Sequence, residues 1–211
     1  MTITTESSNR GRKTYSMEEE KSFFETLRFF LHGLINLESL HLSLAKLPLK
    51  GRMRASLACR DGLGSGRIWP KLQKLSLGHF NFSEAHLRDL LLSHSETLTN
   101  LRLGCIDFPA WGRDNLGPEV CMPATLIAIW TDFLDALRTG LSLEHVELWG
   151  YLGCSWYGPH PGPDGGPDSD IGAWWEPSKD GLAEALFNHL VHGADVSLEY
   201  RMWVKDREDG K

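Results

Sequence analysis

Four segments of the chain share one alternation of apolar and polar positions. Each has three apolar residues spaced as L-x-x-L-x-L, at 37–42, 72–77, 98–103 and 143–148, where Val146 takes the middle place. Along an extended backbone, successive side chains point to opposite sides. Each segment is therefore predicted to be a strand with its leucines in the core and the intervening residues facing outward.

Between and around these strands lie segments in which an apolar residue recurs every three or four positions, the period of a helix. They cover 16–34, 83–91, 131–141 and 182–190. Ser83 is a favourable N-cap residue, Ser16 and Glu19 form a capping box, and Gly140 is typical of a helix end. The alternation from Val196 to Val204 predicts a further strand.

The spacing of the strands is irregular. From Leu40 to Leu75 the interval is 35 residues, from Leu75 to Leu101 it is 26, and from Leu101 to Val146 it is 45. The two long intervals contain stretches rich in Gly, Pro and charge, which are typical of loops. Removing roughly 10 to 20 residues of loop restores a period near 26, as expected when insertions interrupt a repeat.

The strand spacing and the helical segments together are typical of leucine-rich repeats. We predict an α/β fold, a short irregular array of about 4–5 repeats with parallel strands on one face and helices on the other. The domain covers 16–204, and its loop insertions are expected at 48–70, 109–123 and 153–178. Residues 1–15 are expected to form a disordered tail and 205–211 a charged tail.

Composition and charge narrow the kind of function. The net charge of -6 argues against a protein built mainly to bind nucleic acid. No stretch reaches the roughly 18 apolar residues of a membrane span, and the first residues lack the apolar segment of a signal peptide. The four cysteines are too far apart for a C-x-x-C site, so we expect reduced thiols. We therefore expect an intracellular location, in the cytoplasm or the nucleus.

No motif indicates an enzyme, a metal or a cofactor. The sequence contains no zinc-protease, nucleophile-elbow or phosphate-loop motif. His189 and His192 are three residues apart, but no Cys or carboxylate nearby completes a zinc set. The glycines at 62, 64 and 66 are followed by Pro70 rather than by a helix, which favours a flexible insertion over a phosphate site.

The outward positions of parallel strands in register form rows across the sheet. The predicted rows are Ser39, Lys74, Asn100 and His145, then His41, Ser76, Arg102 and Glu147, then Ser43, Gly78, Gly104 and Trp149. Arg and Trp are favoured anchors of protein interfaces. The residues that we predict to contact a partner are His41, Lys74, Arg102, His145, Glu147 and Trp149. The alternative is that they are ordinary solvated residues of the sheet.

The strand motifs, the helix from Ser83 to Leu91 and the ending Leu190–Gly193 resemble the divergent leucine-rich repeat regions of fungal F-box-type proteins. This resemblance implies a substrate receptor of a cullin-based ubiquitin ligase, whose repeats bind the protein to be ubiquitinated and whose F-box docks on an adaptor. The segment from Tyr15 to Leu34 is Glu-rich and then Phe-rich, and it lacks the Leu-Pro opening of an F-box.

The sequence therefore favours a non-enzymatic module that binds another protein through the outward face of its sheet. The alternatives are a ubiquitin-ligase receptor with an adaptor site in residues 16–34, an enzyme with a site that no motif reveals, and a truncated repeat fragment without a function. A metal, a cofactor and a membrane are not expected, and the net negative charge argues against nucleic acid as a partner.

Overall fold

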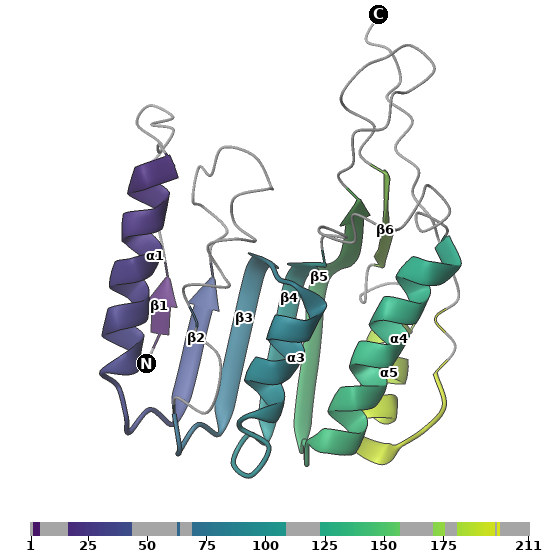
Figure 1. The fold of residues 1–211 in the computed structure, drawn as a ribbon. Coiled ribbons are helices and arrows are strands. Elements are labelled where there is room, and N and C mark those ends of the chain that lie inside the picture. Colours follow the sequence, from purple (N-terminus) through teal and green to yellow (C-terminus); the bar gives the residue numbers. More distant parts are fainter. Residues whose placement is uncertain are drawn as a thin grey trace, which may run out of the picture.

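The protein is described by a computed structural model over residues 2–4, 17–43, 63, 69–108, 123–156, 171–175, 181–196 and 198. Its strands are β1 (Thr2–Thr4), β2 (Ser39–Ser43), β3 (Lys74–Asn81), β4 (Asn100–Asp107), β5 (His145–Trp156) and β6 (Ile171–Trp175). They form one sheet in the order β1-β2-β3-β4-β5-β6, in which only the β5–β6 pair is antiparallel (Figure 1). The predicted α/β fold with a parallel sheet is confirmed.

The register of the central strands is the predicted one. Leu40 pairs with Leu75, Leu75 with Leu101, and Leu101 with Val146, so the apolar positions of neighbouring strands lie side by side. All four side chains are buried. Since burying a leucine side chain contributes about 1.5–3 kcal/mol, a register shift of one residue would expose the whole set and is strongly disfavoured.

Helices supply the other half of the core. The described helices are α1 (Met17–His32), α3 (Glu84–Leu92), α4 (Pro123–Gly140) and α5 (Leu182–His192). α3, α4 and α5 lie on one face of the sheet, and α1 lies at its β1–β2 end (Figure 1). The leucines of α3, at 87, 90 and 91, are buried in the same cluster as the strand leucines.

The predicted helix ends agree with the structure in part. Ser83 is the N-cap residue of α3, with an extended backbone but no side-chain capping bond, and α4 ends at Gly140 as expected. The predicted start near Thr131 is wrong, because α4 already begins at Pro123. Proline is tolerated in the first turn of a helix, where its missing N–H has no partner to lose. Ser16 lies outside the described residues.

Two segments expected to lack regular structure contain strands. Thr2–Thr4, within the predicted disordered tail 1–15, forms β1 and pairs with β2. The predicted insertion 153–178 includes the end of β5 and all of β6, with Trp174 opposite Gly153. β1 and β6 form because the neighbouring strand at each edge of the sheet offers backbone groups that would otherwise have no partner in the sheet. The rest of both segments lies outside the described residues.

At the end of the predicted insertion 48–70, residues 69 and 70 lie outside helices and strands as expected, but Trp69 belongs to the core. Trp69 is fully buried, and its Nε1–H donates to the carbonyl of Leu31 at 2.9 Å. The fully buried His94 stacks on Trp69 with ring centroids 5.6 Å apart. His94 Nε2 accepts from the Trp69 N–H at 3.3 Å, and Nδ1 donates to the carbonyl of Leu90 at 2.8 Å. Trp69 and His94 together join the end of α1 to α3.

Of the remaining predicted segments, the structure describes little. Pro123 is the one described residue of 109–123, and the tail 205–211 lies wholly outside the described residues. Val196 and Leu198 are described and are not in a strand, so the predicted strand from Val196 is wrong at these positions. These positions follow the end of α5, where Gly193 is the C-cap residue and has a left-handed backbone with φ of 71°.

A left-handed backbone residue follows each outward glycine of β3 and β4. His79 has φ of 62° and Cys105 has φ of 50°. Each left-handed residue shifts the alternation of side chains along its strand by one position. Phe80 and Ile106 therefore point toward the core, where both are buried. They pair with each other across β3 and β4.

Candidate functional site

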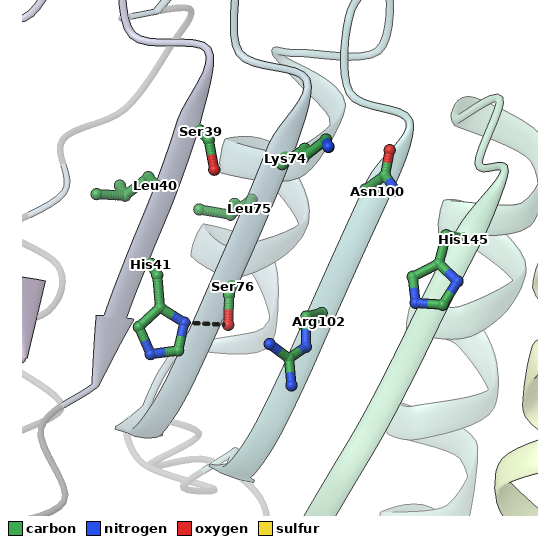
Figure 2. Close-up of a pocket in the computed structure, with 9 residues that line it drawn as sticks. All are labelled: Ser39, Leu40, His41, Lys74, Leu75, Ser76, Asn100, Arg102 and His145. Carbon is green, nitrogen blue, oxygen red and sulfur yellow. Dashed lines mark hydrogen bonds between the residues drawn. The ribbon is translucent and has the colours of Figure 1, made fainter. Parts of the chain in front are cut away.

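The face of the sheet opposite α3, α4 and α5, which we call the outer face, carries all six residues predicted to contact a partner. In Figure 2 the helices lie behind the sheet and the outward side chains point toward the viewer. The pairing of β2 to β5 brings the three predicted rows together as expected. We call them the first, second and third row, beginning with Ser39, His41 and Ser43 respectively.

The first row consists of polar and basic side chains. Lys74 and His145 are exposed, whereas Ser39 and Asn100 are half-buried. The Thr99 hydroxyl donates to Asn100 Oδ1 at 2.8 Å, and this bond leaves the amide nitrogen of Asn100 directed away from it. These residues border a shallow depression of about 210 Å³ between β2 and β5 (Figure 2).

The second row is made of two hydrogen-bonded pairs. His41 Nδ1 lies 2.7 Å from the Ser76 hydroxyl (Figure 2). Arg102 binds Glu147 through two contacts, Nη2 to Oε1 and Nε to Oε2, each 2.7 Å long. The two side chains are 44% and 42% exposed, so the pair contributes only about 0–1 kcal/mol to stability. Its main effect is to fix both groups and to neutralise the charge of Arg102.

The third row is covered by one indole ring. A methyl group on Gly104 would overlap the Trp149 ring, and one on Gly78 would lie 2.7 Å from its outer edge. Trp149 therefore lies flat across β4 and β3 rather than projecting from the sheet. It is half-buried, and its ring meets His79 edge-on at a centroid distance of 5.5 Å. Sequence reasoning placed Trp149 in this row but did not predict that it lies on the two glycines.

His79 adjoins the third row, and its pKa is shifted. Burial against the sheet lowers the pKa of His79 below its ordinary value of 6.5, since desolvation disfavours the charged ring. Its left-handed backbone holds the imidazole beside the Trp149 edge. His79 was not among the predicted site residues, because the strand alternation assigns it to the core side.

The two histidines of α5 have separate structural roles. His189 is buried, with Nδ1 2.8 Å from the Ala194 carbonyl and Nε2 3.2 Å from an Asp135 carboxylate oxygen. His192 instead contacts the Phe187 ring edge-on. Across the described part of the chain, no group of three or more His, Cys, Asp or Glu side chains is arranged to hold a metal ion. The His189 contacts join α5 to α4.

Comparisons of the chain with protein-family models, with curated proteins and with solved structures found no match. Within the described residues, every helix is too short or too polar to cross a lipid bilayer.

Proposed function

We propose that this chain is a non-enzymatic leucine-rich repeat module that binds a protein partner through the outer face. The observation that carries the proposal is the contrast between the two sides of one sheet. One side buries leucines under helices, whereas the other presents Lys74, His145 and the Arg102–Glu147 pair around a shallow depression. Arginine and tryptophan are residues that protein interfaces favour as anchors, and the outer face carries Arg102 and Trp149.

The repeat assignment is supported by a hydrogen-bond pattern that recurs at the entrance to each strand. The backbone N–H groups of residues 73 and 74 donate to the Glu38 carbonyl, and those of 99 and 100 donate to the Gln73 carbonyl. The N–H groups of 144 and 145 likewise donate to the Thr99 carbonyl. Three equivalent contacts between neighbouring strands, all in register, are expected of stacked units that differ mainly in the length of their loops.

The proposal is tested by exchanging the charges of Arg102 and Glu147 on the outer face, which keeps an ion pair at these two positions. The double variant Arg102→Glu with Glu147→Arg keeps opposite charges on neighbouring strands, so folding should be retained. The matched control is Arg88→Glu with Glu84→Arg, which swaps a 3.0 Å ion pair on α3. Tagged chains are used to capture partners from the native cells, and bound proteins are quantified by mass spectrometry.

We expect a specific partner to be retained by the wild type and by the α3 control, and to be lost from the Arg102/Glu147 swap. Like charges placed across an interface cost several kcal/mol of binding free energy. The amount of partner captured by the Arg102/Glu147 swap should therefore fall at least about tenfold. Equal capture of every protein by the wild type and both folded variants would contradict a role for the outer face.

A second candidate function is favoured by the exposure of aromatic side chains on α1. Phe29 is 84% exposed, and Phe23, Phe30 and Ile35 are also exposed. The resemblance to F-box-type proteins implies an adaptor site in this segment. If that is its role, a ubiquitin-ligase adaptor should co-purify with the wild type and be lost from Phe29→Ser, while the Arg102/Glu147 swap should still retain it.

A further inference from the structure

We infer that the first row of the outer face binds an acidic segment of the partner, with Lys74 and His145 contacting its carboxylates. This inference rests on the proposed function and specifies the chemistry of that partner. The depression is lined by His41, Lys74, Arg102 and His145 together with hydroxyl, amide and leucine side chains, and by no Asp or Glu. Because Glu147 neutralises Arg102, Lys74 is the group that gives this depression a positive charge, in a chain whose net charge is -6.

The groups available for a ligand are found in the first row rather than in the second. Arg102 is already held by both oxygens of Glu147, and His41 by the Ser76 hydroxyl. Within the described residues, the side chains of Lys74 and His145 form no ion pair, and both are exposed. A carboxylate that binds there would therefore gain the charged Lys74 side chain and a hydrogen bond from the His145 imidazole, without breaking an existing contact.

The geometry of the row suits an extended peptide. Neighbouring strands are about 4.8 Å apart, so β3 and β5 place Lys74 and His145 roughly 10 Å apart. Same-side residues of an extended peptide recur about every 7 Å, a difference that the flexible lysine side chain can span. Between them, the Asn100 amide nitrogen can donate to a peptide carbonyl or a carboxylate.

The test uses three fluorescent peptides of about twelve residues that differ at four alternating positions, which carry Glu, Gln or Lys. Binding to the full chain is measured by anisotropy at low and at physiological salt. Two double variants are compared, Lys74→Gln with His145→Gln and the control Lys71→Gln with His32→Gln. Lys71 and His32 are exposed and lie outside the depression, so the control removes the same side-chain types elsewhere.

We expect the Glu peptide to bind at least about tenfold more tightly than the Gln peptide, because the contact is electrostatic, and to weaken with salt. The Lys74/His145 variant should lose about tenfold in affinity, and the control should stay within about twofold of the wild type. Equal binding of the Glu and Gln peptides, or an unchanged affinity of the Lys74/His145 variant, would overturn the inference.

Failure of this inference can be distinguished from failure of the proposed function. If the Arg102/Glu147 swap loses a protein partner while no peptide binds, the outer face remains the docking surface and the acidic ligand is wrong. If the swap loses nothing and the Glu peptide fails to bind, both statements are wrong.

Discussion

Replacing Gly104 with alanine should destabilise the sheet, because the added methyl group would overlap the Trp149 ring. An indole can bury 150–250 Å² of surface, and Trp149 is half-buried, so roughly 100 Å² of ring contact depends on this position. At about 25 cal/mol per Å², displacing the ring would cost on the order of 2 kcal/mol. This value lies within the 1–3 kcal/mol that is typical of overpacking.

A double-mutant cycle isolates the contact. In a Trp149→Ala background the obstacle to the methyl group is gone, so Gly104→Ala should be neutral or stabilise the strand by about 0.5–1 kcal/mol. The coupling between the two positions should therefore be roughly 2–3 kcal/mol. Gly78→Ala is the graded control: its added methyl group would approach only the far edge of the ring, at 2.7 Å, and should cost less.

The free energy of unfolding is measured by urea titration followed by circular dichroism, since the eight tryptophans of the chain would obscure a fluorescence readout of one ring. An equal cost of Gly104→Ala with and without Trp149 would refute the reasoning, because the ring would then not lie on that glycine.

Three further predictions concern the core, the buried contact of His94 and the titration of His79. Leu75→Asp should abolish the cooperative urea transition by burying an unpaired charge, whereas Arg102→Ala should cost only about 0–1 kcal/mol; similar effects would contradict the assigned faces. His94→Ala should cost about 2–4 kcal/mol, since the Trp69 N–H loses its acceptor and a cavity opens beside the indole; an unchanged urea midpoint would contradict the buried contact. Because burial lowers the native pKa of His79, the unfolded chain binds more protons as the pH falls below about 6.5 toward the native value, so stability should fall in that window. His79→Asn, which tolerates the left-handed backbone, should flatten that part of the stability profile, and an unaltered profile would contradict this role.

The register of β2 to β5 was predictable because L-x-x-L-x-L states which positions face the core. Leu75 and Leu101 had to share one side, so Lys74 and Arg102 had to share the other. The Arg102–Glu147 pair could also have been predicted, because opposite charges occupy adjacent places in one row. In these strands the apolar positions of the sequence pattern are the positions that face the core.

The interaction of Trp149 with the sheet left a weaker signal in the sequence. Gly78 and Gly104 stand in the same row as Trp149, and two residues without side chains beside a large ring indicate a space that the ring fills. The relation becomes visible only after the strands are aligned, because the three residues come from separate segments.

Other elements could not be predicted because tertiary contacts decide them. Thr2–Thr4 and Ile171–Trp175 are too short to show a period, and each is a strand because a neighbouring edge offers backbone partners. Trp69 follows a glycine-rich stretch, and its burial could not be predicted, because it depends on the carbonyl of Leu31 and the ring of His94. These contacts join residues far apart in the sequence.

The central claim, that the outer face is a protein-binding surface, is tested most directly by site-specific photocrosslinking in the native cells. A photoreactive phenylalanine analogue is placed at position 145 on the outer face or, as a control, at position 88 on α3, and cross-linked products are identified by mass spectrometry. We predict a discrete cross-linked protein from position 145 and none from position 88. A product from position 88 alone would contradict the account, because the partner would then bind the helical side of the molecule.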